Sequence, residues 1–267
     1  MANLYINQAK QYAVGRPDYP KQLFQYIASK TPSHDLAWDV GTGTGQAARS
    51  LAELYKNVVA TDTSPTQLEH ATKLPNIRYQ HTPPTMSLEE LQQKVVATES
   101  SVDLVTVATA MHWFDLPKFY EQVRWVLKKP DGVIAAWSYC LPEVNEAVDA
   151  VLLRFDDNLD WDPERKLVDE KYTTIDFPFE PVEGESDTGP FDQFAIERMM
   201  SFDEYLMLPR TWSAYQKAKE KGVELLGADV VEDFRRAWNV NGDGQKLARF
   251  PIYLRIGRVG VTPQPRG

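Results

Sequence analysis

Three glycines on alternate positions dominate the stretch LAWDVGTGTGQAARSLA, which runs from Leu36 to Ala52 of this 267-residue chain. Gly41, Gly43 and Gly45 follow a short apolar run and precede a helix-like stretch. Glycine tolerates positive φ and has no side chain to obstruct an approaching molecule. The expected chemistry is therefore the binding of a nucleotide-like cofactor against the backbone of this turn.

Two aspartates narrow the choice of cofactor. Asp39 lies two residues before the first glycine, within the expected strand, where a carboxylate beside pyrophosphate has no obvious use. Asp62 follows Gly45 by 17 residues, close to the ~20-residue offset at which an acidic side chain accepts hydrogen bonds from ribose hydroxyls. The combination predicts an adenosine ligand with a cationic end, and S-adenosylmethionine has that shape. The alternative is that both aspartates only cap the helices that follow them.

A nicotinamide-dependent oxidoreductase is a second hypothesis for the same turn. The dinucleotide fingerprint has the spacing G-x-G-x-x-G. Counted from Gly41, its last glycine is replaced by Gln46, and counted from Gly43 it is replaced by Ala48, which the looser form tolerates. The spacing disfavours a dinucleotide without excluding it.

Short apolar segments alternate with helix-length amphipathic segments in the first half of the chain. This alternation predicts an α/β fold with a parallel sheet and helices on both faces, which binds ligands at the carboxyl ends of its strands. Strands are expected at 36–40, 58–61, 77–81, 102–108 and 133–137, and helices at 46–55, 64–73, 87–96 and 117–127.

The pattern changes from Leu141 onwards, and acidic and aromatic residues are concentrated at 156–181. Residues 1–140 and 240–267 are expected to form the cofactor-binding domain, and residues 141–239 a helical and irregular lid that binds the acceptor. In the second half, strands are expected at 191–198 and 250–259, and helices at 201–208, 212–220 and 223–238.

Four stretches of the chain resemble class I S-adenosylmethionine-dependent methyltransferases, in particular the trans-aconitate methyltransferase-like branch with its type 11 methyltransferase domain. The resemblance implies a Rossmann-like, seven-stranded, mostly parallel sheet whose last strand is antiparallel. It covers about the first 140 residues well and the final strand more loosely. The stretches are YAVGRPDYP at 12–20, DVGTGTGQ at 39–46, DTSPTQL at 62–68 and AMHWFD at 110–115.

The resemblance also implies which residues meet the cofactor. The turn and Asp39 would contact the methionine part, Asp62 the ribose, and Gln67 or Leu68 the surroundings of the adenine. An N-terminal segment would fold over the cofactor and offer Arg16 to its carboxylate. The residues so implied are Tyr12, Arg16, Asp39, Gly41, Thr42, Gly43, Gly45, Asp62, Gln67, Ala108 and Thr109. Many relatives have an acidic residue after the third strand, which this chain lacks, so Thr82 or backbone would contact the adenine.

The acceptor decides whether a base is needed. A carboxylic acid has an unperturbed pKa of roughly 4 and is ionised at neutral pH, so it needs none. A hydroxyl acceptor would need one, and His112 is then the candidate, because imidazole titrates near neutrality; a packed, hydrogen-bonded histidine is the alternative. Trp113 and Trp212 would wall the acceptor pocket, with core packing as the alternative. Arg210 could hold an acceptor carboxylate, and Tyr215, the second catalytic candidate, could assist it; helix packing and surface solvation are the alternative for both.

The main prediction is an S-adenosylmethionine-dependent methyltransferase that acts on a small molecule and forms a methyl ester on a carboxylic acid. Hydroxyl, carbon or nitrogen acceptors, and a catalytically silent binding protein, are the alternatives. A net charge of −9 without a basic cluster disfavours nucleic acid. No long apolar run predicts a membrane span, and the single cysteine, Cys140, fits the cytoplasm. No metal-ligand motif is found, and the oligomeric state stays open.

Overall fold

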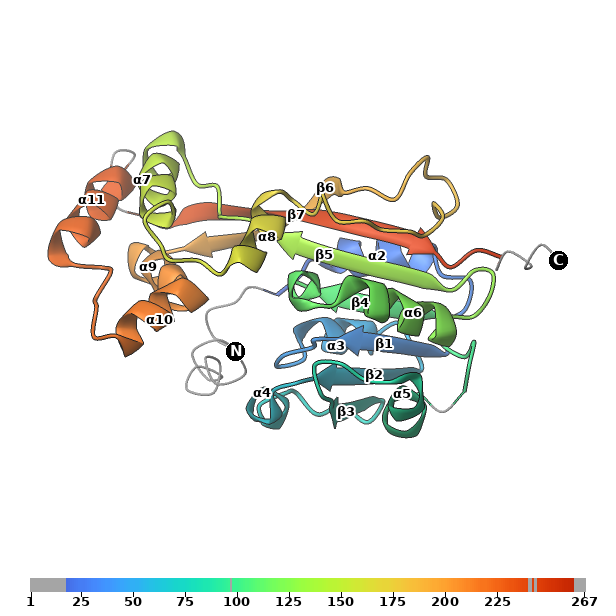
Figure 1. The fold of residues 1–267 in the computed structure, drawn as a ribbon. Helices are drawn as coiled ribbons and strands as arrows, with labels where there is room; N and C mark the ends of the chain where they lie inside the picture. The colour runs from blue at the N-terminus through green and yellow to red at the C-terminus, as the bar shows by residue number, and fades with distance from the viewer. Residues whose placement is uncertain (1–17, 97, 240–241, 243, 262–267) are drawn as a thin grey trace.

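Seven strands form one sheet in the computed structural model, which describes residues 18–96, 98–239, 242 and 244–261. The strands are β1 (Leu36–Val40), β2 (Asn57–Asp62), β3 (Ile77–His81), β4 (Leu104–Ala108), β5 (Val133–Tyr139), β6 (Phe191–Met200) and β7 (Lys246–Arg258). Their order across the sheet is β3-β2-β1-β4-β5-β7-β6 (Figure 1).

The sheet is parallel from β3 to β5, and β7 runs antiparallel to both of its neighbours, β5 and β6. This arrangement confirms the predicted seven-stranded, Rossmann-like sheet. The strand order reverses between β1 and β4, since β2 lies on one side of β1 and β4 on the other. In open α/β sheets the ligand site lies outside the carboxyl ends of the strands at such a switch point.

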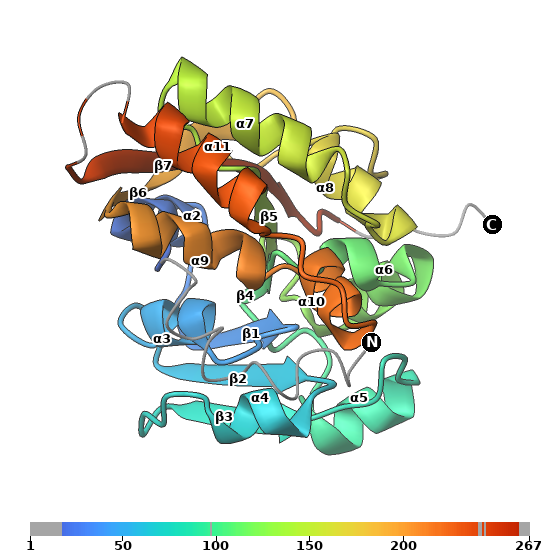
Figure 2. The ribbon, with the colours of Figure 1, turned by 90° about the vertical axis from the view of Figure 1, so that its left-hand side faces the viewer.

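Helices cover both faces of the sheet. Those of the first half are α2 (Lys21–Ser29), α3 (Gln46–Leu51), α4 (Pro65–Glu69), α5 (Leu88–Lys94) and α6 (Leu116–Val126), with a short 3₁₀ turn, η2 (Met111–Trp113). Figure 2 shows α2 and α3 on one side of the sheet and α5 and α6 on the other. One apolar core includes Leu23 and Leu51, and the other includes Leu91 and Val123. Burial on both faces explains why these strands read as apolar runs.

The helices of the second half gather beyond the carboxyl ends of the parallel strands (Figures 1 and 2). They are α7 (Glu146–Asp156), η3 (Pro163–Arg165), α8 (Lys166–Asp169), α9 (Phe202–Arg210), α10 (Ser213–Glu220) and α11 (Ala228–Asn239). The same range contains β6, which pairs with β7 at the edge of the sheet. Residues 141–239 therefore contribute an edge strand as well as the helices above the site.

Three predicted helices differ from the structure by four or more residues at one end. The helix predicted to reach Tyr55 ends at Leu51. The helix predicted from Val223 begins at Ala228, because Glu224 accepts hydrogen bonds from the Tyr215 hydroxyl and from the Leu226 N–H, which fixes a non-helical turn. The helix predicted to reach Lys73 ends at Glu69, and a proline at position 75 disfavours helical backbone in the residue before it.

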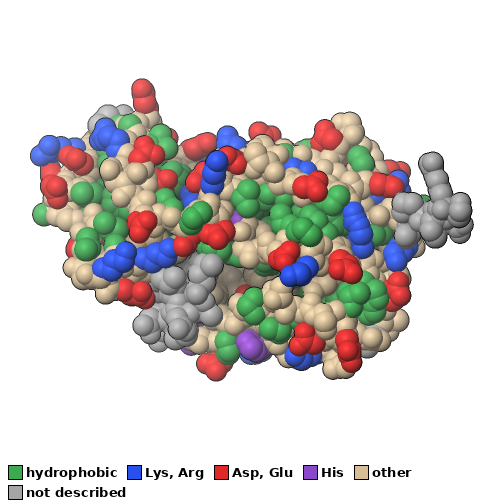
Figure 3. Space-filling model, in the orientation of Figure 1, with side chains coloured by type: hydrophobic (Ala, Val, Ile, Leu, Met, Phe, Trp, Pro, Cys, Tyr) green, Lys and Arg blue, Asp and Glu red, His purple; other side chains and the backbone are tan. Residues whose placement is uncertain are grey.

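The surface carries both signs of charge. On the face drawn in Figure 3, the described Lys and Arg side chains are interspersed with Asp and Glu rather than gathered in a basic patch. Among the described helices, none has the length and apolar character needed to cross a membrane.

Candidate functional site

The glycine turn joins β1 to α3 at the carboxyl edge of the sheet. Gly41, Gly43 and Gly45 have φ of +68°, +60° and +85°, a region that residues with a Cβ rarely adopt. A Cβ on Gly41 would lie 2.7 Å from the Cβ of Ala110, in the loop after β4. Glycine is therefore required here both for the backbone conformation and for the close approach of two loops.

Asp62, at the end of β2, fixes the turn and faces the space above it. Its Oδ2 accepts a hydrogen bond from the Gly43 N–H at 2.8 Å, and its Oδ1 accepts one from the Ser64 N–H at 2.8 Å. Burial raises the pKa of the Asp62 carboxyl, and these N–H donors oppose that rise. A carboxylate has more acceptor sites than these two bonds use, which leaves capacity for the hydroxyls of a ligand.

Asp39 lies behind the turn and not in the open space. Its carboxyl is fully buried and accepts hydrogen bonds from the hydroxyls of Thr42 at 2.5 Å and Thr106 at 2.7 Å. Burial raises the pKa of Asp39 to about 6. The side chain thus ties the glycine turn to β4, and it reaches the ligand space through Thr42 rather than directly.

A cleft of about 760 Å³ opens above the turn. Its volume falls within the ~300–1,000 Å³ typical of small-ligand sites. The predicted cofactor residues that line it are Gly41, Thr42, Gly43, Asp62, Gln67, Ala108 and Thr109, and Thr82 lines it as well. Gly45 and Asp39 support the turn without lining the cleft, while Tyr12 and Arg16 lie outside the described residues.

Thr109, directly after β4, has a φ of +54°, which is uncommon for a threonine. Its N–H donates to the Trp137 carbonyl at 2.7 Å, and its hydroxyl lies 3.1 Å from the Tyr19 hydroxyl. These contacts hold the strained backbone in place. Such strain is often kept at functional sites, and Thr109 lines both the cleft and the cavity next to it.

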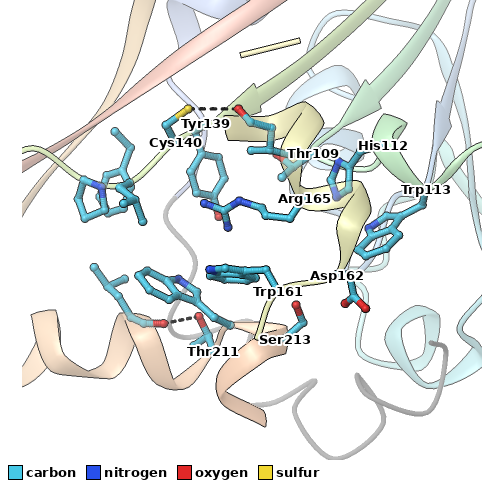
Figure 4. Close-up of a pocket in the computed structure, with 16 residues that line it drawn as sticks. Thr109, His112, Trp113, Tyr139, Cys140, Trp161, Asp162, Arg165, Thr211 and Ser213 are labelled. Carbon is cyan, nitrogen blue, oxygen red and sulfur yellow. Dashed lines mark hydrogen bonds between the residues drawn. The ribbon is translucent and has the colours of Figure 1, made fainter. Parts of the chain in front are cut away.

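That second cavity, of about 110 Å³, shares Thr109, Trp113 and Tyr139 with the cleft. Aromatic side chains form much of its wall, including Trp161, Trp212, Phe250 and the shared Trp113 and Tyr139. Figure 4 shows His112 facing this space from η2, and Trp161 and Arg165 facing it from the segment that leads into and forms η3. We call it the acceptor pocket after the role proposed below, because it adjoins the cleft at the end of β4.

The residues predicted for the acceptor divide into two groups. His112, Trp113 and Trp212 line the second cavity, and the Nδ1 of His112 lies 3.0 Å from the Tyr172 hydroxyl. Neither Arg210 nor Tyr215 belongs to the described residues that line the pocket or the cleft. The Tyr215 hydroxyl donates to Glu224, and the Arg210 Nη1 lies 3.8 Å from the sulfur of Met207.

Arg165 is the pocket cation that sequence reasoning missed. It ends η3, its guanidinium lies 4.3 Å from the centre of the Trp161 ring, and its Nε donates to Asp169 at 2.8 Å. The nearby carboxylate of Asp162 is engaged by Lys217. Trp161 lies before η3 and not within it, so a helical repeat does not account for the pair, and the only signal in the sequence was that the two residues lie four positions apart.

The chemistry of the cleft fits S-adenosylmethionine. Three features occur together at the switch point. The glycine backbone lets a ligand approach closely, the Asp62 carboxylate lies at the sequence offset expected of a ribose-binding acid, and the cleft is large enough for the cofactor. Within the described residues, no group of His, Cys, Asp and Glu is placed to hold a metal ion.

Known proteins share these features. The methyltransferase domain family matches residues 38–136. A Dictyostelium discoideum protein described as a methyltransferase is 30% identical over 259 residues, which cover 94% of this chain and 92% of that protein. A Saccharomyces cerevisiae protein described as an S-adenosylmethionine-dependent methyltransferase is 32% identical over 151 residues, or 52% of this chain and 49% of its own length.

A solved structure agrees with this result. The Anaeromyxobacter dehalogenans protein described as a type II methyltransferase superimposes with a TM-score of 0.75 and 33% identity, over 91% of this chain and 98% of its own. The fold and the cleft define a class I S-adenosylmethionine-dependent methyltransferase. The chain belongs to the methyltransferase family that these relatives represent, and its placement in the trans-aconitate methyltransferase-like branch stays a prediction.

Proposed function

We propose that this protein transfers a methyl group from S-adenosylmethionine to a small carboxylic acid and forms its methyl ester. The observation that carries the proposal is the junction of the cleft and the acceptor pocket at Thr109, Trp113 and Tyr139. S-adenosylmethionine supplies a methyl group that its sulfonium activates for displacement. A ligand in the cleft and an acceptor in the pocket would meet at this junction.

On the cofactor side, the backbone of Gly41 and Gly43 admits the ligand, and Asp62 accepts hydrogen bonds from its ribose hydroxyls. Gln67 and Thr82 lie along the same cleft, where they would border the adenine. Tyr12 and Arg16 stay part of the proposal through the family resemblance alone.

On the acceptor side, the protein has to align a nucleophile with the methyl group and to exclude water. The aromatic wall of the pocket serves the second need. Arg165 supports the choice of a carboxylate, because a guanidinium offers further N–H donors beyond the Nε that Asp169 uses. It takes the place that we expected Arg210 to fill. Residues 141–239 supply Trp161, Arg165 and Trp212, which supports an acceptor-binding role for this range.

Calorimetric titration tests the cofactor. We expect a folded sample to bind both S-adenosylmethionine and S-adenosylhomocysteine, and binding of neither would contradict the proposal. A nicotinamide dinucleotide serves as the negative control, because the oxidoreductase hypothesis requires that it bind.

A screen for released S-adenosylhomocysteine tests the acceptor. Small carboxylic acids, phenols and amines are offered in turn, and products are identified by mass spectrometry. We expect methyl esters of acids. Turnover of phenols or amines without any acid would overturn the choice of a carboxylate while leaving methyl transfer itself intact.

A further inference from the structure

His112 contacts Tyr172, a tyrosine to which the proposed reaction assigns no role. The Nδ1 of His112 lies 3.0 Å from the hydroxyl of Tyr172, which follows α8 and is completely buried. Tyr172 has a φ of +57°, and its carbonyl accepts a hydrogen bond from Nη1 of Arg255 at 3.1 Å. The tyrosine is therefore held at its backbone while its hydroxyl meets the imidazole.

The direction of this hydrogen bond follows from the other partners of the Tyr172 hydroxyl. Backbone N–H groups of Met111 and His112 act on its oxygen so as to lower its pKa, and an N–H can only donate. In the described part of the chain, the acceptor for the hydroxyl proton is then Nδ1 of His112. Burial raises the pKa of Tyr172 far above neutrality, so the phenol keeps that proton to donate. A buried hydroxyl without an acceptor would be costly.

We propose that Tyr172 is a positioning residue that holds His112 as the tautomer with its proton on Nε2. His112 then presents an N–H donor to the acceptor pocket and not a lone pair. Because a neutral imidazole has one donor nitrogen and one acceptor nitrogen, fixing Nδ1 as the acceptor removes the general-base role. The tautomer follows from the geometry of Tyr172, whereas its use in the reaction rests on the proposed function.

This tautomer suits a carboxylate acceptor. One carboxylate oxygen attacks the methyl group, and the other accepts a hydrogen bond from Nε2–H of His112. The O–CH₃ bond forms as the bond from methyl to sulfur breaks, the bonding pair stays on sulfur, and no proton moves. A hydroxyl acceptor would instead have to lose a proton, which a donor nitrogen cannot take.

Nitrogen NMR of the protein alone tests the tautomer. In a long-range ¹H–¹⁵N spectrum of ¹⁵N-histidine-labelled protein, we expect a pyridine-type shift for Nδ1 of His112 and a pyrrole-type shift for Nε2. The protein has four histidines, and the set of signals that disappears in His112→Gln belongs to His112. A pyrrole-type Nδ1 in the wild-type protein would overturn the proposal.

Tyr172→Phe tests the positioning role, because it removes only the hydroxyl. We expect the two His112 nitrogen shifts to move towards each other as the tautomers mix. Tyr120→Phe is the matched control, since it removes another tyrosine hydroxyl of the same core, which donates to the Asp176 carbonyl at 2.7 Å, and should leave His112 unchanged. Unchanged His112 shifts in a folded Tyr172→Phe protein would overturn the role of Tyr172. If that variant fails to fold, the wild-type spectrum decides.

Activity separates a donor from a base. His112→Gln keeps an N–H donor, whereas His112→Ala removes it, so with a carboxylic acid we expect the alanine variant to lose about tenfold more kcat/KM. Equal and near-complete loss in both variants would overturn the donor role. Absence of methyl transfer from the wild-type protein to any acid would contradict the proposed function and not the tautomer, which the spectrum measures without substrate.

Discussion

Asp62 serves two purposes with one side chain, since it fixes the glycine turn and faces the cleft. We expect Asp62→Ala to raise the Kd for S-adenosylmethionine, because the ribose hydroxyls lose their acceptor at a cost of about 1–3 kcal/mol. Calorimetric titration measures the change. Asp131→Ala, which removes an exposed carboxylate paired with Arg258, is the control and should bind normally. An unchanged Kd in folded Asp62→Ala would exclude Asp62 from the site.

Asp39 makes stability depend on pH. Burial raises the pKa of its carboxyl from 3.8 to about 6, so the folded protein disfavours the charged form. Its contribution to the free energy of unfolding is full below pH 3.8 and is lost as the pH rises through about 6, a change of about 3 kcal/mol.

Asp39→Asn removes this ionisation and isolates the effect. We expect the free energy of unfolding of the wild-type protein, relative to the variant, to fall between pH 4 and pH 7 by about 3 kcal/mol at most. Urea denaturation across that range measures it. A difference that stays constant with pH would show that Asp39 is not the titrating group.

At this same scale, sequence reasoning placed the residues that line the cleft better than the arginine that lines the adjoining pocket. The spacing of Gly41, Gly43 and Asp62 follows from one strand–turn–helix unit, so local sequence is enough to place them. The choice between Arg165 and Arg210 depends on how α8 and α9 pack above the sheet, which local sequence does not encode. Both arginines end a short helical segment, and only the tertiary structure shows that Arg165 lines the pocket and Arg210 does not.

The segment that contains η3 and α8 is predicted to set acceptor specificity. We expect Arg165→Gln to raise the KM for a carboxylic acid about tenfold or more and to leave the Kd for S-adenosylmethionine unchanged, because a charge-assisted hydrogen bond contributes about 1.5–3 kcal/mol. Arg210→Gln is the matched comparison, since Arg210 contacts the sulfur of Met207 and does not line the pocket. Steady-state kinetics measure both variants. A larger rise in the KM for the carboxylic acid in Arg210→Gln would show that Arg210, at the end of α9, binds the carboxylate.

How well each helix or strand could be predicted depended on which part of the chain packs against it. The parallel strands were predicted almost to the residue, because burial on both faces leaves an apolar run bounded by turn residues. α7 was missed, although Asn145 caps its first turn by accepting from the Val148 N–H. Its buried side chains pack against α11 from far along the sequence, and the acidic residues around it resemble a loop.

For the whole molecule, binding in the cleft should stabilise the fold. A ligand at a hundredfold excess over its Kd stabilises the native state by about 2.7 kcal/mol. We therefore expect S-adenosylmethionine and S-adenosylhomocysteine to raise Tm by several degrees and NAD to leave it unchanged. Differential scanning fluorimetry measures both. A rise with NAD alone would favour the oxidoreductase hypothesis.

The wall that Thr109, Trp113 and Tyr139 share between the cleft and the acceptor pocket makes the two compartments neighbours without a spacer. A single compound that joins an adenosine group to a small carboxylic acid would occupy both at once. Its second half would bind at the high effective concentration that a short link imposes, so the two affinities would reinforce each other. The shared wall thus makes this protein a target for bisubstrate inhibitors, and the length of their linker would report the distance between the two bound groups.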